Sequence, residues 1–121
     1  MPRLPAALLA APLLASAALP AAAQDAPPAL SINYACEGGA ELQVAYINPA
    51  SGPSLAVVGW AGRLIPMRQG PSASGVRYIA FDEQRSYRWW SKGDEGFLVF
   101  MAADHEATEE PVLSDCRAIP G

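Results

Sequence analysis

The sequence contains little of what enzymes use for catalysis. Its only histidine is His105, which lies between Asp104 and Glu106, and no G-x-S-x-G motif places a serine on a sharp turn. A serine–histidine–aspartate site would therefore need Ser72 or Ser74 to be brought to His105 by the fold alone. We interpret His105 as a solvated loop residue, and we predict that the protein is not an enzyme.

The first 23 residues have the pattern of a cleaved export signal. A short basic lead (residues 1–3) precedes an apolar run of alanine and leucine (residues 4–19), and residues 21–23 (AAA) match the small-residue site that signal peptidase reads. The apolar run is short for a membrane span, which makes a membrane anchor the weaker alternative. No cysteine follows the run, which excludes a lipoprotein signal. We predict cleavage after Ala23 and a mature protein that is soluble and exported.

Only two cysteines, Cys36 and Cys116, are present, near the two ends of the mature sequence. An even number of cysteines in an exported chain predicts one disulfide. In the chain-entropy model, closing so long a loop stabilises a fold by about 4–5 kcal/mol. A redox or metal role is the alternative, but the chain has no C-x-x-C motif and too few converging ligands for zinc. We therefore predict a structural disulfide, no metal site and no cofactor.

Basic residues are few. Removal of residues 1–23 leaves seven lysines and arginines against 12 acidic residues, a net charge of −5. Nucleic-acid binding depends on neutralising phosphates with basic side chains, so this balance argues against a nucleic-acid partner. An acidic surface favours encounter with a cationic partner. The same charge is also what keeps an ordinary protein soluble, so charge alone does not identify a function.

The mature chain lacks any convincing helix of ten residues. Residues 24–29 (QDAPPA) predict an extended or disordered leader, and residues 30–121 form the folded domain. Apolar residues there alternate with period two, as at Leu42, Val44 and Tyr46, and turn signals separate the runs. Pro66 predicts an edge or a bend in its strand, because proline has no N–H for pairing. Seven or eight short strands are expected, at residues 30–36, 42–46, 54–60, 63–67, 76–81, 86–90, 97–101 and 112–119.

This pattern predicts an all-β fold, a small antiparallel barrel or sandwich. Closure into a barrel would remove the exposed strand edges that invite aggregation. Trp89 and Trp90 should point to opposite faces of one strand, one into the core and the other outward. The outward tryptophan could stack on a sugar ring, which makes a cell-wall or carbohydrate-binding module an alternative function.

Two small loops flank the predicted hairpin. Residues 71–75 (PSASG) are rich in hydroxyls, and residues 91–94 (SKGD) offer one ammonium beside a glycine. Each loop alone is an ordinary turn. Together they form a set of hydrogen-bond donors that suits a pocket lined by carboxylates, with few large side chains to obstruct approach.

Four features carry a resemblance to a known family, namely residues 34–36 (YAC), residues 72–78 (SASGVRY), residues 90–95 (WSKGDE) and the closing Cys116. With these motifs the chain resembles the bacterial inhibitors of C-type (animal) lysozyme, the membrane-bound and periplasmic lysozyme inhibitors. The resemblance implies an eight-stranded antiparallel β-barrel with a disulfide between its terminal strands. It also implies that two loops enter the active-site cleft of a cationic C-type lysozyme.

The resemblance assigns roles to residues by their position within the motifs. The serine most important for binding falls on Ser74 and the lysine on Lys92, with Ser72, Gly75 and Gly93 in the same loops. Two further matched positions shape or flank the first loop, and they are Arg77 and Tyr78. Because the signal lacks a lipid-accepting cysteine, the resemblance implies the soluble periplasmic branch, without a membrane anchor.

One departure from the family pattern bears on the site. The segment between Tyr78 and Trp90 looks a few residues longer than expected. If the extra residues only lengthen the hairpin tip, the loops keep their places. If they shift the strand register, Lys92 no longer lies beside Ser74.

Overall fold

The computed structural model describes residues 28–103 and 106–120, so the predicted signal peptide (residues 1–23), most of the leader and His105 lie outside the described residues. The described chain contains eight antiparallel strands and a short 3-10 helix, η1 (Glu37–Gly39). The strands are β1 (Ala29–Ala35), β2 (Glu41–Ile47), β3 (Leu55–Trp60), β4 (Arg63–Gly70), β5 (Val76–Ala80), β6 (Arg85–Lys92), β7 (Glu95–Ala102) and β8 (Glu110–Ile119).

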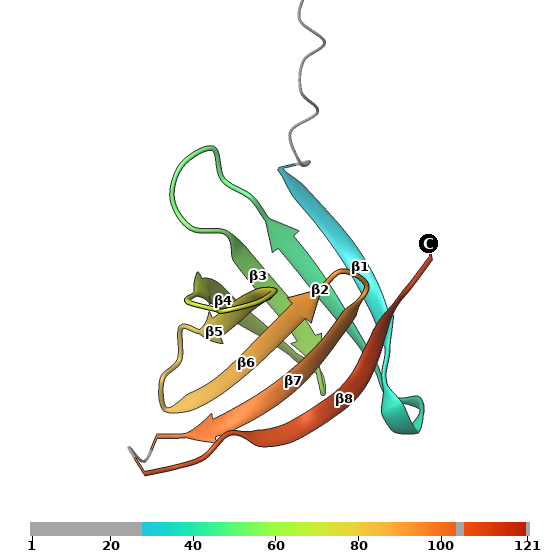
Figure 1. The fold of residues 1–121 in the computed structure, drawn as a ribbon, viewed down its shortest axis with the longest axis vertical. Helices are drawn as coiled ribbons and strands as arrows, with labels where there is room; N and C mark the ends of the chain where they lie inside the picture. The colour runs from blue at the N-terminus through green and yellow to red at the C-terminus, as the bar shows by residue number, and fades with distance from the viewer. Residues whose placement is uncertain (1–27, 104–105, 121) are drawn as a thin grey trace, which may run out of the picture.

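Each strand pairs with the next along the chain, and β1 also pairs with β8, so the sheet closes into a barrel (Figure 1). The all-β prediction is confirmed, and of its two architectures the barrel is correct. Closure rests on a short contact, because only Asn33–Ala35 of β1 lie opposite Arg117–Ile119 of β8.

Alternation along the strands decides which side chains fill the barrel. Leu42, Val44 and Tyr46 of β2 are buried, as their period-two spacing predicted. Trp89 of β6 is fully buried, whereas Trp90 lies on the outer face and is partly exposed. The fully buried side chains come from most of the strands, the largest being Trp89, Tyr34, Leu42, Met67 and Leu98.

Polar groups in the core are joined to one another. The indole N–H of Trp89 donates to Tyr46 Oη (2.8 Å), and the hydroxyls of Tyr34 and Tyr46 share a hydrogen bond of 2.6 Å. Burial and this bond raise the pKa of Tyr34 far above its usual range. Buried polar groups destabilise a fold unless they are paired. These hydrogen bonds pair the polar atoms of the buried aromatic side chains, so their burial does not leave unsatisfied groups in the core.

The edge predicted at Pro66 is not observed, because β4 pairs with both β3 and β5 in the closed barrel and the carbonyl oxygen of Pro66 accepts a hydrogen bond from the backbone N–H of Phe81 (3.1 Å). Pro66 lies opposite Val57 of β3, and the register with β5 begins only at Met67. The strand predicted at residues 63–67 ends later than expected, because Gln69 and Gly70 pair with β5 and extend β4 to Gly70. Local sequence could not show this, since a glycine next to a proline is an ordinary loop signal.

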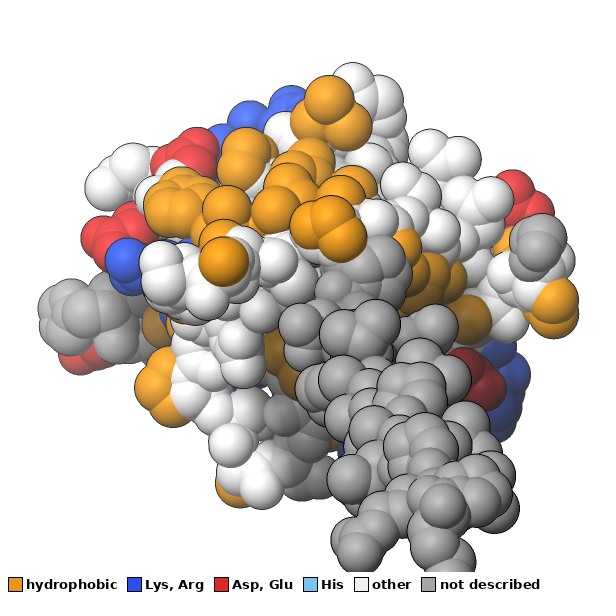
Figure 2. All heavy atoms as spheres, turned by 90° about the horizontal axis from the view of Figure 1, so that it is seen from above, with side chains coloured by type: hydrophobic (Ala, Val, Ile, Leu, Met, Phe, Trp, Pro, Cys, Tyr) orange, Lys and Arg blue, Asp and Glu red, His pale blue; other side chains and the backbone are white. Residues whose placement is uncertain are grey.

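The surface of the barrel carries both apolar and charged groups. Seen from above the view of Figure 1, hydrophobic side chains gather over one part of the surface, with acidic and basic side chains at its margin (Figure 2). Within residues 28–103 and 106–120, no helix has the length and apolar character needed to cross a membrane.

Cys36 and Cys116 form the predicted disulfide, which joins the end of β1 to β8 across a sequence separation of 80 residues. Replacing both cysteines by alanine should lower the free energy of unfolding by about 4–5 kcal/mol, because the unfolded chain is no longer constrained. Urea unfolding of the variant and the oxidised wild type measures this. Equal midpoints with equal slopes would contradict a stabilising role for the disulfide.

Candidate functional site

The two small loops meet at one end of the β5–β6 hairpin. Val76 lies opposite Ser91, so Gly75 comes next to Lys92. A Cβ atom built on Gly75 would lie 3.2 Å from Lys92 Cβ and 2.6 Å from the carbonyl oxygen of Ser91. Ser74 directly precedes Gly75. Ser74 and Lys92 therefore emerge side by side, and Figure 1 shows the β4–β5 loop alongside the end of β6.

The hairpin tip does not disturb this arrangement. The turn between β5 and β6 lies at residues 81–84, at the opposite end of the hairpin from the two loops. The segment that looked long in the sequence is therefore accommodated at the tip, and the register between Val76 and Ser91 brings the loops together.

Two glycines make the loops possible. Gly75 has φ 70° and no room for a side chain against Ser91. Gly93 has φ 58° and occupies the first position of the two-residue turn that joins Lys92 to Glu95, where a type II′ hairpin requires a glycine. In both loops, the residue that follows the serine or the lysine therefore has no side chain.

The backbone of the first loop is held from two sides at Ser74. Its carbonyl oxygen accepts a hydrogen bond from the indole Nε1 of Trp90 (3.0 Å) and another from Ser72 Oγ (2.7 Å). The hydroxyl of Ser74 makes no hydrogen bond with the residues that the structure describes, and the residue is exposed. The loop is fixed through its backbone while the hydroxyl of Ser74 faces solvent.

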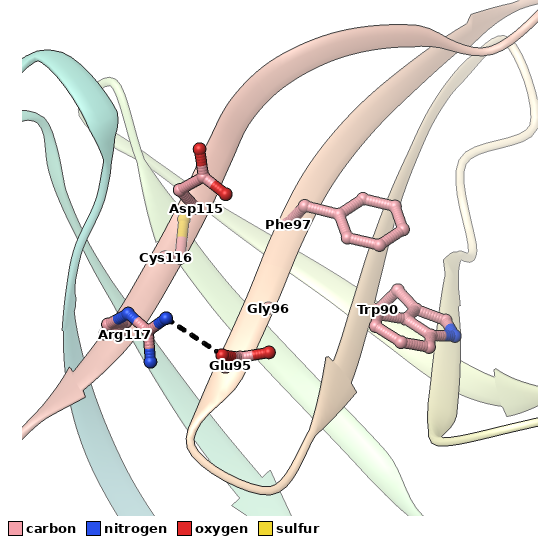
Figure 3. A pocket seen from close by; sticks show the side chains of 7 residues that line it. All are labelled: Trp90, Glu95, Gly96, Phe97, Asp115, Cys116 and Arg117. Carbon is pink, nitrogen blue, oxygen red and sulfur yellow. Dashed lines mark ion pairs between the residues drawn. The ribbon is translucent and has the colours of Figure 1, made fainter.

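The ammonium of Lys92 is also available. Glu95 lies directly opposite Lys92 in the hairpin, but its carboxylate pairs with Arg117 at 3.0 Å (Figure 3). Across residues 28–103 and 106–120, no carboxylate lies within ion-pair distance of Lys92. Lys92 is exposed, so its charge can be offered to a partner.

Two aromatic rings stand beside the loops on the outer face of the barrel. Trp90 of β6 and Phe97 of β7 stack with ring centroids 4.9 Å apart and an interplanar angle of 29° (Figure 3). The rings border a shallow pocket of about 120 Å³, which is lined by Trp90, Glu95, Gly96, Phe97, Asp115, Cys116 and Arg117. Trp90 thus contacts Phe97 through its ring and Ser74 through its N–H.

The remaining two candidate residues lie on β5, the strand that follows the first loop. Tyr78 faces the core with 5% exposure, against the ring of Tyr46, and burial raises its pKa. Arg77 is partly exposed and pairs with Glu109. Tyr78 thus packs inside the barrel and Arg77 lies on its outer face, where Glu109 holds it, whereas Ser72, Ser74 and Lys92 are exposed.

An ionic cluster fastens the segment before β8 to the hairpin. Glu109 Oε1 accepts hydrogen bonds from Arg77 and from Arg88 Nη1, the latter at 2.8 Å. Partial burial opposes ionisation of Glu109, but the bonds from Arg88 and Arg77 outweigh it, so the pKa of the carboxyl lies below its usual range. Glu109 lies between the predicted strands at residues 97–101 and 112–119, and no local sequence pattern marks it as the partner of two arginines.

This set of groups defines the kind of protein. It offers a hydroxyl, an ammonium and glycine backbone at one end of the hairpin. Among the described residues, no three His, Cys, Asp or Glu side chains converge as metal ligands. Hydroxyl and ammonium groups donate hydrogen bonds to carboxylates. The class that the fold and site define is therefore a small β-barrel binding protein.

Comparison with known proteins assigns the family. The family model for membrane-bound lysozyme inhibitors of C-type lysozyme matches residues 34–107. A protein of that name from Cupriavidus necator is 36% identical over 95 residues, which cover 78% of this chain and 70% of the relative. The chain belongs to this family, whose members are inhibitor proteins and not enzymes.

Solved structures agree. The periplasmic C-type lysozyme inhibitor of Salmonella typhimurium matches with a TM-score of 0.65 and 26% identity, covering 77% of this chain and all of that one. The Pseudomonas aeruginosa inhibitor, crystallised in complex with hen egg white lysozyme, matches with a TM-score of 0.56 and 32% identity, covering 78% and 87% of the two chains. The family resemblance seen in the sequence is confirmed.

Acid should release the ionic cluster at Glu109. Because the pKa of Glu109 is lower in the folded protein than the value of about 4.3 in an unfolded chain, the pairing stabilises the fold above that pH and is lost as the pH falls through the folded-state value. We expect Glu109→Gln to unfold at lower urea than wild type at pH 7, and the difference to shrink as the pH falls below the range in which Glu109 of the folded protein ionises. Glu110→Gln is the matched control, because Glu110 makes no ion pair with a described residue. A Glu109→Gln variant as stable as wild type at neutral pH would contradict the cluster's role.

Proposed function

We propose that this protein inhibits C-type lysozyme by placing residues 71–75 and 91–94 in the active-site cleft of the enzyme. The observation that carries the proposal is the pairing of an exposed hydroxyl at Ser74 with an exposed, unpaired ammonium at Lys92 on one end of a rigid hairpin, within the described residues. Related proteins are named as inhibitors of this enzyme, and one was crystallised with it.

The chemistry of the target explains the choice of donors. A C-type lysozyme works with a glutamic acid and an aspartate on either side of the bond that it cleaves. In the proposed complex, the ammonium of Lys92 reaches these carboxyl groups and the hydroxyl of Ser74 donates a hydrogen bond to one of them. No bond is broken, and inhibition is competitive with the polysaccharide substrate.

Shape supports the same partner. Lysine carries a compact charge on a slim stem, which enters a narrow cleft more easily than the broad guanidinium of arginine. Gly75 and Gly93 leave the flanking backbone without side chains. Charge-assisted bonds in a desolvated cleft are strong only where the geometry is good, and the loop is held by two hydrogen bonds before any partner arrives.

Cellular placement follows from the sequence. Cleavage after Ala23 would release the protein into the periplasm of a Gram-negative cell, where an inhibitor protects peptidoglycan from lysozyme. The alternative function, a carbohydrate-binding module, would need Trp90 to present a ring to a sugar. The stacking of Trp90 on Phe97 and its bond to Ser74 favour a supporting role in the inhibitor over this alternative.

Removing the lysine should weaken inhibition strongly. We expect Lys92→Ala to lose about 2–5 kcal/mol of binding free energy, because charged groups of the enzyme are left buried and unpaired. Ser74→Ala should lose about 1–3 kcal/mol. Inhibition constants from turbidity assays of lysozyme on bacterial cells measure both effects.

The matched control for this experiment is Arg85→Ala. Arg85 begins β6 and Lys92 ends it, so the control removes one positive charge from the same strand at the far end. It should leave the inhibition constant within about a factor of two, as expected of an exposed charge away from an interface. A Lys92→Ala variant that inhibits as well as wild type would show that this lysine does not bind the enzyme.

Association should depend on salt. Residues 24–121 have a formal net charge of −5 and the proposed partner is cationic, so opposite charges accelerate encounter and ions screen the attraction. We expect the association rate constant from stopped-flow fluorescence to fall by about tenfold or more between about 0.02 M and 0.2 M salt. An association rate that does not change with ionic strength would contradict electrostatic steering.

A further inference from the structure

Trp90 connects the outer face of the barrel to the serine loop. Its indole N–H donates to the carbonyl oxygen of Ser74 across the β5–β6 hairpin, at 3.0 Å. Its ring packs against Gly75, because a Cβ on that glycine would lie 3.1 Å from Trp90 Cζ2. Phe97 on the next strand stacks on Trp90. Two strands, β6 and β7, and the loop before β5 therefore meet at one side chain that is not part of the core.

The alternative supports of the loop are weaker. Ser72 Oγ donates to the same carbonyl at 2.7 Å, but Ser72 is exposed and lies within the loop itself, so it moves with what it holds. The bond from Trp90 is the side-chain hydrogen bond, among the described residues, that ties the loop to a strand of the barrel. A loop anchored to a strand loses less conformational entropy on binding than a free one.

We propose that Trp90 is a positioning residue that pre-organises the Ser74 loop for its partner. Trp90 fixes the backbone of Ser74, and this directs the Ser74 hydroxyl beside Lys92 before binding. Phe97 holds the indole in the orientation that this bond requires. The inference rests on the proposed function for its effect on inhibition, but its effect on the loop belongs to the free protein alone.

The test uses Trp90→Phe, which keeps an aromatic ring beside Phe97 and removes the N–H. In the free variant, we expect the ¹⁵N order parameters of the Ser74 and Gly75 amides to fall from about 0.85 toward 0.6. Trp60→Phe is the matched control, because Trp60 is also half-buried and its side chain donates no hydrogen bond to a described residue. It ends β3 opposite Arg63 at the start of β4, whereas the loop follows the end of β4. The control should leave the loop unchanged. Unchanged order parameters in Trp90→Phe would overturn the inference.

A double-mutant cycle separates positioning from direct contact. Trp90→Phe should weaken lysozyme inhibition by about 2- to 10-fold, the change that one hydrogen bond corresponds to. In the Ser74→Ala background the same substitution should have less than about a 2-fold effect, because the hydroxyl it positions is absent. Equal weakening in both backgrounds would mean that Trp90 acts independently of Ser74, and would overturn the inference.

The two arms also separate this inference from the proposed function. If the wild type does not inhibit lysozyme at all, the proposed function fails, and the order parameters still decide whether Trp90 holds the loop. If the wild type inhibits and Trp90→Phe neither loosens the loop nor weakens inhibition, the proposed function stands and the positioning role is wrong.

Discussion

The register between β5 and β6 is the constraint on which the site depends. A slip of one residue would turn every side chain of β6 to the other face, which would expose Trp89 and drive Trp90 inward. Trp89 prevents this slip, because it is fully buried, bonds to Tyr46 Oη and packs directly on Gly96. The aromatic core therefore sets the position of Gly75 against Lys92 on the surface.

Closure of the barrel secures the same end of the molecule. The backbone N–H of Ala118 in β8 donates to the carbonyl oxygen of Asp94, in the turn that follows Lys92, at 2.8 Å. Two residues earlier, Cys116 fixes β8 to the end of β1 through the disulfide. The contact between β1 and β8 is short, so this covalent link near the turn contributes rigidity where few strand pairs supply it.

Much of the fold was readable from local pattern. Period-two alternation predicted the buried face of β2, the opposite faces of Trp89 and Trp90, and a set of strands close to those observed. The choice between barrel and sandwich was not readable from the strands themselves, because closure depends on a pairing between the first and last of them. The family resemblance supplied the barrel.

The sequence predicted the exposed residues of the candidate site but not the contacts that hold the two loops in place. Ser74 and Lys92 were predicted as site residues through their motifs, and their proximity follows from the hairpin register. Other contacts join residues that are distant in sequence, and local sequence patterns do not predict them. They are the hydrogen bond from Trp90 to Ser74 and the ion pairs of Glu109 with two arginines. Tyr78 matched the motif as well, but the structure places it in the core against the ring of Tyr46.

The central claim is that the loop end of the barrel occupies the cleft in which lysozyme binds sugar. Calorimetric titration of the protein into hen egg white lysozyme, with and without a saturating chitin oligosaccharide in the cleft, tests it most directly. The claim predicts that the oligosaccharide lowers the apparent affinity in proportion to its own concentration over its dissociation constant, as for two ligands of one site. Binding of unchanged affinity to sugar-saturated lysozyme would contradict it.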